Sequence, residues 1–322
     1  MNHKASQIMD TSSIEAHPPY KGQKTADMLS QLPMELITYI LCDACLLSTS
    51  FCTALSDLSK WTRTLALPFL YRTIVIKKQG PSAAFSQLVS EIPIYSPQPH
   101  FKPKDHVKNL WVSAVSNRVL AIFEVCDNVV NLALHAENFL WLVHASTSNP
   151  SSDFSTSVLR PRSITRKSDL DVLIISAKKP NWSLINFVPS GNLPSSPVFA
   201  KITHLRIGSI GSYSSYLELA HFKRLTHIAV PYHRPGIHHL QQLLRVFDFP
   251  ATVFLVVVFM TDEITDENYE AGLRWIAHVR STNPKVYAVP AQLCNLQQEW
   301  EDEVRGGLSI WNRAENFTEA LT

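Results

Sequence analysis

Three cysteines near the amino terminus are the residues whose type and spacing are best suited to chemistry. Cys42 and Cys45 are separated by two residues, and Cys52 follows them. Thiolates at this spacing could bind zinc, but a tetrahedral site needs four ligands, and the nearest histidines in sequence are His17 and His100. An odd total of five cysteines in apolar surroundings is more typical of small buried side chains than of a disulfide framework or a metal site. We predict no metal ligand and no cofactor.

Other titratable residues give little sign of catalysis. His238 and His239 lie in a predicted helix, where neighbours face different directions, and neither has an obvious carboxylate or cysteine partner. Glu263, Asp266 and Glu267 lie at a predicted helix start, where the helix dipole alone accounts for acidic residues. The sequence contains no phosphate-binding glycine motif and no G-x-S-x-G. We predict that the chain is not an enzyme, although a deep pocket with two convergent titratable groups would argue for one.

The bulk composition narrows the class of protein. The chain has 322 residues, of which 45% are apolar and 17% are charged, and its formal net charge is +2. This length suits one large domain or two smaller ones. A near-neutral charge gives no support for nucleic-acid binding, which would need Lys and Arg concentrated on one face or element. We therefore predict no nucleic-acid partner.

Two segments bear on targeting and membrane insertion. Residues 1–31 are polar and have no continuous apolar stretch, so they are not a signal peptide. The longest apolar run, 251–260, covers about half of a membrane crossing and is rich in Val and Phe, which favours a buried strand. We expect a soluble protein in the cytoplasm, the nucleus or both, neither secreted nor bound to a membrane.

The first 72 residues divide into a tail and a helical module. We predict a disordered tail at 1–30, because it is polar and lacks a period, and a module at 31–72. Pro33 suits a first helical position, where its missing N–H would be unpaired. An apolar stripe follows at helical spacing: Leu32, Leu36, Ile37, Ile40 and Leu41. A second series marks one further helical stretch that Pro68 is expected to end: Leu47, Phe51, Leu55, Leu58 and Leu65.

Short β-rich runs alternate with helical stretches from residue 73 onward. We predict strands at 73–76, 109–112, 131–134, 172–175, 205–207, 228–230 and 253–259. Helices are predicted at 82–92, 118–126, 237–247 and 267–280. Alternation of this kind is typical of a mostly parallel sheet with covering helices. The predicted fold class is therefore α+β overall, with N-terminal helices followed by an α/β region at 73–296.

A weak internal repeat runs through the α/β region. Asn109-Leu-Trp-Val112 resembles Asn131-Leu-Ala-Leu134, and His204-Leu-Arg-Ile207 resembles His227-Ile-Ala-Val230. The steps of 22 and 23 residues fall within the range of leucine-rich repeats, whose L-x-L strands send apolar residues into a stacked core. An ordinary α/β sheet remains the alternative, because the other steps are irregular.

The C-terminal segment and three loops complete the predicted organisation. A helix at 297–317, within a terminal segment 297–322, would place Trp300, Val304, Leu308 and Trp311 on one face and pack it on the domain. Gly306-Gly307 is expected to weaken or bend this helix. Pro- or Ser-rich stretches at 93–105, 146–168 and 189–197 are predicted to be exposed loops, and the basic residues of the second could meet phosphate or an acidic partner.

The N-terminal motifs resemble those of a known family. Leu32-Pro-Met-Glu-Leu36, followed by Ile40 and Leu41, is similar to the start of an F-box, and Leu65-Ala-Leu-Pro-Phe-Leu-Tyr-Arg72 is similar to its close in fungal F-box-like proteins. Glu299-Trp300, Arg305-Gly-Gly307 and Trp311 resemble the tail of the same group. One departure is Thr62, where the family usually has an aromatic residue.

This resemblance implies a non-catalytic role. F-box proteins dock through three helices onto a Skp-type adaptor on a cullin scaffold, and the rest of the chain captures a protein substrate for ubiquitination. The implied adaptor-binding residues are Leu32, Pro33, Glu35, Leu36, Ile40, Leu41, Leu55 and Leu58. Target contacts are expected among loops and strand edges of the α/β region, where Tyr213, Tyr216, Tyr232, His233 and Arg234 are candidates or ordinary surface residues.

The residues themselves support docking, with one alternative. A module of this length cannot bury all its large apolar side chains, and each one left in water forgoes about 1.5–3 kcal/mol. A partner helix in an apolar groove would recover much of this. Alternatively, the stripe packs on the chain's own α/β region, and the protein is an interaction or scaffold protein with no ubiquitin role.

Overall fold

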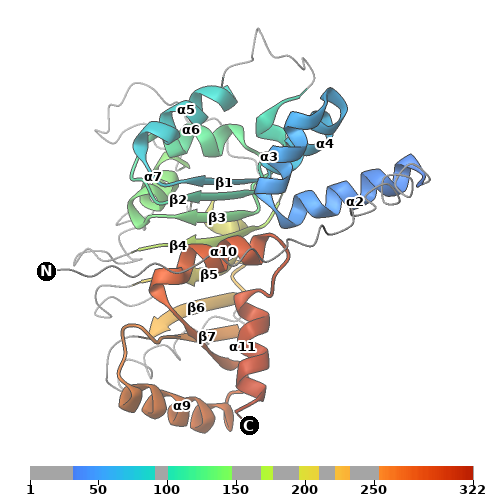
Figure 1. Cartoon of the computed structure of the whole chain (residues 1–322). Coiled ribbons are helices and arrows are strands. Elements are labelled where there is room, and N and C mark those ends of the chain that lie inside the picture. The colour runs from blue at the N-terminus through green and yellow to red at the C-terminus, as the bar shows by residue number, and fades with distance from the viewer. Residues whose placement is uncertain are drawn as a thin grey trace, which may run out of the picture. The chain divides into compact units, whose positions relative to one another are not determined.

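The computed structural model describes residues 32–90, 101–146, 168–176, 196–209, 222–232 and 254–321 (Figure 1). The chain divides into two compact units, Met1–Asp43 and Ala44–Thr322, which are described separately. The predicted tail at 1–30, the predicted helix at 237–247 and most of the three predicted loops lie outside the described residues. N-terminal helices precede a parallel sheet, which confirms the predicted α+β class.

Three helices form the N-terminal segment: α2 Met34–Leu47, which crosses the division between the units, α3 Thr49–Leu58 and α4 Lys60–Leu70. In α2 the carbonyl of Pro33 accepts the N–H groups of Leu36 and Ile37, at 3.0 and 3.2 Å. Pro33 therefore precedes the helix as its cap rather than forming its first residue.

The second predicted helical stretch is instead two helices, because Ser59 interrupts it. Ser59 is extended, its Oγ accepts the Thr62 N–H at 3.1 Å, and its own N–H donates to Thr62 Oγ1 at 2.9 Å. This reciprocal cap satisfies two N–H groups and starts α4. The prediction that Pro68 ends the helix was wrong by two residues, because a proline in the last turn removes one hydrogen bond without preventing the final residues from staying helical.

Eight strands within the described residues form one sheet in which every neighbouring pair is parallel and the spatial order follows the sequence order. They are β1 Thr73–Ile76, β2 Asn109–Val112, β3 Asn131–Leu134, β4 Leu170–Ile174, β5 Ile202–Ile207, β6 His227–Tyr232, β7 Phe254–Met260 and β8 Val286–Ala291. The order has no reversal, unlike that of doubly wound sheets. The internal repeat aligns in space, since Asn109 pairs with Asn131 and His204 pairs with His227.

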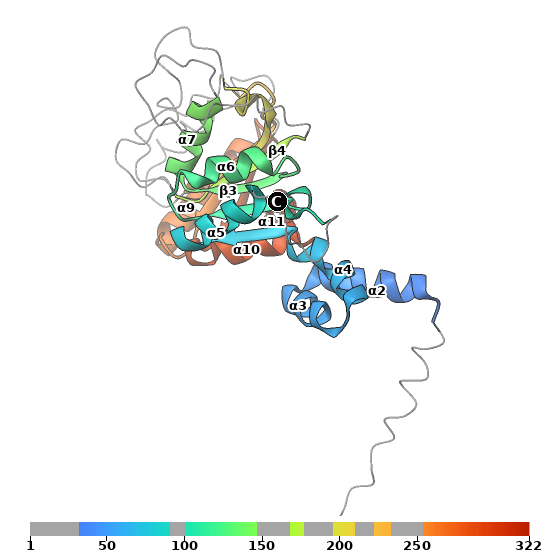
Figure 2. The same ribbon diagram turned by 90° about the horizontal axis from the view of Figure 1, so that it is seen from above.

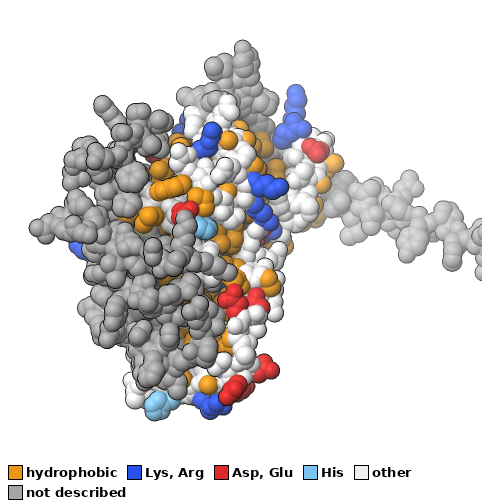
Figure 3. Space-filling model, turned by 90° about the vertical axis from the view of Figure 1, so that its left-hand side faces the viewer, with side chains coloured by type: hydrophobic (Ala, Val, Ile, Leu, Met, Phe, Trp, Pro, Cys, Tyr) orange, Lys and Arg blue, Asp and Glu red, His pale blue; other side chains and the backbone are white. Residues whose placement is uncertain are grey.

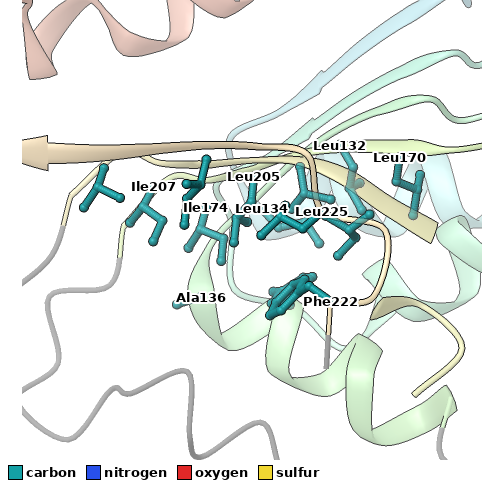
Figure 4. Close-up of a cluster of buried hydrophobic side chains, with 14 of the residues drawn as sticks. Leu132, Leu134, Ala136, Leu170, Ile174, Leu205, Ile207, Phe222 and Leu225 are labelled. Atoms are coloured by element: carbon teal, nitrogen blue, oxygen red, sulfur yellow. The ribbon is translucent and has the colours of Figure 1, made fainter. Parts of the chain in front are cut away.

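One face of the sheet, here called the first face, packs against α5 Gln79–Ser90, α6 Arg118–Val125, α7 Ala136–Ser146 and α9 Asp266–Arg280. Figure 2 shows α5, α6 and α7 together on one side of the strands. The core there is a continuous apolar layer in which Leu132, Leu134 and Ile174 are fully buried. Figure 4 shows these side chains directed from the strands toward Phe222 and the helices.

The opposite, second face packs against two C-terminal helices, α10 Leu296–Val304 and α11 Ile310–Glu319, which lie in front of the strands in Figure 1. The single helix predicted at 297–317 is divided because Gly306 has a φ of 104°, a backbone conformation that ends α10. Leu308 lies between the two helices and is 62% exposed, so its predicted place on one apolar face was wrong. Trp300 and Trp311 are buried, as predicted.

The β8 edge of the sheet is closed by side chains. Thr318 Oγ1 on α11 accepts the Ala288 N–H at 2.8 Å, and its proton can go to the carbonyl of Ala288 or of Ala314, at 3.1 and 2.6 Å. Arg280 Nη1 donates to the Val286 carbonyl at 2.8 Å. The carbonyl of Val286 and both backbone groups of Ala288 are thus paired within the chain at this edge. Three short 3-10 turns complete the described elements: η1 Pro103–Asp105, η3 Phe199–Lys201 and η5 Leu293–Asn295.

Candidate functional site

The second face of the sheet carries a row of polar and aromatic side chains at one register position. The members of this cross-strand row pair successively from β1 to β7: Thr73, Asn109, Asn131, Asp171, His204, His227 and Phe254. A parallel strand places residues two apart on the same face, so Arg206 lies on this face as well. The helices α10 and α11 pack over this row, so polar side chains of the row lie in the interior of the protein there.

The amide half of the row is internally hydrogen-bonded. Asn131 Nδ2 donates to Asn109 Oδ1, and Asn109 Nδ2 donates to Thr73 Oγ1, both at 2.8 Å. Asn109 is buried, so these bonds replace hydration that its amide would otherwise lose. This half of the row supports the sheet and has its partners already.

The aromatic half of the row is a stack. Ring centroids are 4.1 Å apart for His204 and His227, 4.6 Å for His227 and Phe254, and 4.7 Å for Phe254 and Tyr287. Trp311 of α11 packs against both histidines. Burial lowers the pKa of His204, and burial together with His204 lowers the pKa of His227 to about 4. Both imidazoles are therefore neutral at pH 7 and behave as stacking rings.

Ion pairs fasten α10 and α11 to β5. Arg206 Nη2 donates to Glu299 Oε2 at 3.0 Å, and Arg313 Nη2 donates to the same oxygen at 2.8 Å. Arg206 Nη1 lies 3.8 Å from Glu303 Oε2. Burial opposes ionisation of Glu299, but these arginines lower its pKa on balance, whereas burial raises the pKa of Glu303. Buried charges in such a network are stable only while each has its partner.

Asp171 lies at the centre of the row, between the amide half and the aromatic half. Burial and the negative charge of Glu303 raise the pKa of Asp171 to about 7, against the opposing effects of the Trp311 N–H and the Arg206 charge. The Trp311 indole nitrogen nevertheless makes no hydrogen bond among the described residues. Asp171 is thus a carboxyl group that changes charge close to neutral pH.

A cavity of about 210 Å³ lies between the second face and the C-terminal helices. Its lining consists of Asn131, Asp171, Leu173, Arg206, Trp300, Glu303, Val304, Ser309, Ile310 and Trp311. Two titratable carboxyl groups converge there, which is the feature that would favour an enzyme. The hydroxyl in the lining, Ser309 Oγ, instead accepts the Asn312 N–H at 3.2 Å and caps α11. The arrangement brings polar and titratable groups together around a space that can hold a polar group.

The predicted adaptor-binding residues of the first unit lie on α2 or just before it. Leu36 is 49% and Ile40 53% exposed, and Pro33 and Glu35 are also exposed. Leu32 and Leu41 are half-buried. Met34 and Tyr39, which were not among the predicted residues, are exposed large apolar side chains of the same unit.

The two predicted residues of the second unit differ from each other. Leu58 is 74% exposed at the end of α3, whereas Leu55 is 4% exposed and belongs to the packed interior. Phe51 and Trp61 are further exposed apolar residues that the prediction omitted. Helical spacing placed Leu55 and Leu58 in one series, and both lie in α3, but they face different environments along that helix. Arg305 Nη2 donates to Thr49 Oγ1 at 3.0 Å, which ties the start of α3 to the end of α10.

The cysteines and the acidic cluster have local roles. Cys52 donates its thiol proton to the Cys45 carbonyl, and burial and Cys45 raise the pKa of the Cys52 thiol to about 12. Across the described ranges no three His, Cys, Asp or Glu side chains gather as metal ligands; His17 and His100 lie outside those ranges. Asp266 and Glu267 occupy the first turn of α9, as the dipole interpretation predicts.

Of the remaining sequence candidates, Tyr232 alone lies within the described residues. Tyr232 is buried in β6 with its ring edge-on to Phe259, so it is not a surface contact. Tyr213, Tyr216, His233, Arg234, His238 and His239 lie outside the described residues. The face drawn in Figure 3 shows basic and acidic side chains interspersed with apolar ones.

Comparisons with protein-family models, with curated proteins and with solved structures found no match to this chain. Among the helices that the structure describes, none has the length and apolar character required to cross a bilayer.

Proposed function

We propose that this chain is a non-catalytic F-box-like protein, the substrate-recognition subunit of an SCF-type ubiquitin ligase. In this role α2, α3 and α4 bind a Skp-type adaptor that is carried by a cullin, and the sheet region binds an unknown protein substrate. The proposal places the protein in the cytoplasm or the nucleus. The observation that carries it is the set of large apolar side chains left exposed on these helices, in the segment whose sequence resembles an F-box.

The exposed side chains provide the energy for docking. Leu36 and Ile40 in the first unit, and Leu58 in the second, expose about half or more of their surface. Complete burial of such a side chain is worth about 1.5–3 kcal/mol, so a partner that covers several of them gains a stable interface. Leu55 is buried and would support α3 from within rather than contact the adaptor.

The sheet region suits target recognition. Sequential parallel strands at steps of 22 and 23 residues support a degenerate leucine-rich-repeat-like array. Because α10 and α11 cover part of the second face, we expect target contacts at the loops that follow the strands and at strand edges.

A co-purification experiment tests the proposal. The full chain is mixed with a purified Skp-type adaptor, and Leu36→Asp is compared with the wild type and with Leu308→Asp. Leu308 is also exposed but lies between α10 and α11, so it controls for a charged residue at an exposed leucine. We expect Leu36→Asp to abolish adaptor capture and Leu308→Asp to retain it. A wild-type chain that captures no adaptor, or equal capture by both variants, would contradict the proposal.

The second candidate is an interaction or scaffold protein with no ubiquitin role, in which the N-terminal helices cap the array. The bond from Arg305 to Thr49 favours this alternative, because it joins α3 to the C-terminal helices within one unit. Stable folding of the chain without any capture of the adaptor would support it.

A further inference from the structure

The cavity beneath α10 and α11 contains polar groups that the protein's own packing leaves incompletely used. Its volume of about 210 Å³ compares with about 30 Å³ for one water molecule in the liquid, so it can hold a group of several non-hydrogen atoms. The adaptor-binding helices contribute no residue to its lining. The inference drawn from it is independent of the proposed function.

Charges around the cavity do not balance. Two guanidinium groups, those of Arg206 and Arg313, face three carboxyl groups, those of Asp171, Glu299 and Glu303. Glu299 receives hydrogen bonds from both arginines, whereas Glu303 lies 3.8 Å from Arg206 and accepts the Ile310 N–H at 3.1 Å. Asp171 has no ion pair among the described residues. When all five groups are ionised, the cavity therefore holds one negative charge that either a proton or a cation must neutralise.

Three buried donors around the cavity make no close hydrogen bond among the described residues: Arg206 Nη1, Trp311 Nε1 and Arg313 Nε. The Arg206 side chain is only 5% exposed, and its Nη1 has only the 3.8 Å ion pair with Glu303. A buried donor without an acceptor costs about 1–3 kcal/mol. A ligand that satisfies this site therefore needs two features at once, a cationic donor for the carboxylates and an oxygen acceptor for the N–H groups.

We propose that this cavity binds a primary ammonium group with a neighbouring carbonyl oxygen, the chemistry shared by the first residue of a peptide and by amino-acid amides. The ammonium group pairs with Asp171 and Glu303, and the carbonyl oxygen accepts from Arg206 Nη1. The indole of Trp311 beside Asp171 adds a favourable environment for a cation. A free amino acid binds more weakly, because its carboxylate restores the unbalanced negative charge.

Calorimetric titration of the full-length chain at about pH 7.5 tests this site, with alaninamide as the probe. We expect alaninamide to bind and N-acetylalaninamide, which lacks the charge, to bind at least about tenfold more weakly, a difference of about 1.4 kcal/mol. A short peptide amide with a free amino terminus distinguishes the two possible ligands, a polypeptide end and a small amino-acid amide. If the peptide binds more tightly than alaninamide, the ligand is a polypeptide end. If the peptide does not bind, the ligand is a small amide. Absence of alaninamide binding, or equal binding of the acetylated probe, overturns the proposal.

The variant Asp171→Asn keeps the shape of the side chain and removes its charge. We expect it to weaken alaninamide binding at least about tenfold while the protein stays folded, since it removes a partly buried charge that has no ion pair among the described residues. Asp169→Asn is the matched control, because Asp169 pairs with Arg224 at the surface. Leu36→Asp should leave alaninamide binding unchanged. Undiminished binding by Asp171→Asn overturns the proposal.

The pH dependence of binding provides a further check. The groups that influence Asp171 are Glu303, Arg206 and Trp311, with His204 and Asn131 beside it in the row. Because the pKa of Asp171 is about 7 and that of an α-amino group is about 7.7–8.0, affinity should rise from pH 6, reach a maximum between these values and fall above pH 8. Affinity that does not change over this range contradicts the assignment of Asp171 as the ion-pair partner.

Discussion

The two faces of the sheet are made by alternate residues of the same strands, yet they are filled in different ways. The first face is a continuous apolar layer under α5, α6, α7 and α9. The second face combines apolar clusters with the cross-strand row and the ion pairs of Arg206. Because successive strand residues point to opposite faces, the leucines of the repeat can maintain the core while the residues between them vary. The polar row and the continuous hydrophobic layer thus occupy opposite faces of the same strands.

The energetics of the two faces also differ in kind. On the first face, each buried leucine contributes through area and close packing, and neighbouring side chains make similar contributions. On the second face, a polar side chain stabilises the protein only while its partners are present, and the contribution of a titratable side chain also changes with pH. The following variants separate these two kinds of contribution.

The largest effect is expected on the first face. Leu134→Ala removes a fully buried side chain and leaves a cavity, so the free energy of unfolding should fall by about 2–5 kcal/mol at any pH between 5 and 8. Urea denaturation measures this loss. Leu308→Ala, at an exposed leucine, should change stability by less than about 0.5 kcal/mol. A small effect of Leu134→Ala would mean that the first face is not the main source of stability.

A smaller effect with the opposite sign is expected for Asp171→Asn. The pKa of Asp171 is about 7 in the folded protein against an ordinary value of 3.8, so the folded state retains a proton that the unfolded state releases between these values. The wild type therefore loses stability as pH rises from about 4 to 7. We expect the variant to exceed the wild type by roughly 2–4 kcal/mol at pH 8 and to match it near pH 4. Urea denaturation at both pH values measures this difference, with Asp169→Asn as the control.

The smallest effect concerns the aromatic half of the row. The pKa of His227 is about 4 in the folded protein against an ordinary value of 6.5, so the unfolded state binds the proton first and stability falls as pH decreases through this interval. His227→Phe keeps a ring between His204 and Phe254. Between pH 7 and pH 4.5 it should lose about 1–3 kcal/mol less stability than the wild type. Identical pH profiles would show that His227 is not protected from protonation in the folded state.

Local patterns predicted most of the sheet but not all of it. The bounds of β1, β2 and β3 matched the predictions, because each is a short apolar run beginning with Thr or Asn. The strand β8 was missed, since Pro290 argues against a central strand, and the structure places it at an edge, where its missing N–H is tolerated. The helix α7 was missed because it lacks distinct start and stop signals.

The cavity was beyond prediction because its parts are distant in sequence. Asp171 and Arg206 lie on strands, whereas Glu303 and Trp311 lie on the C-terminal helices, and no spacing connects them. One signal was present: Asp171 interrupts the otherwise apolar and buried run of β4, and Arg206 lies between two buried apolar residues of β5. A charged residue inside a parallel strand indicates that some other element must supply a partner on that face.

The hydroxyl group of Thr318 pairs backbone groups of the last strand in the sheet. An unsatisfied parallel strand would offer its amides to another molecule, and successive copies could then extend the sheet into a filament. Ala288 is hydrogen-bonded to Thr318 of α11, and Val286 is hydrogen-bonded to Arg280. A second chain that approached β8 would therefore have to displace these hydrogen bonds first. The carboxyl-terminal helix thus reduces the number of open backbone groups that this edge offers for pairing with another chain.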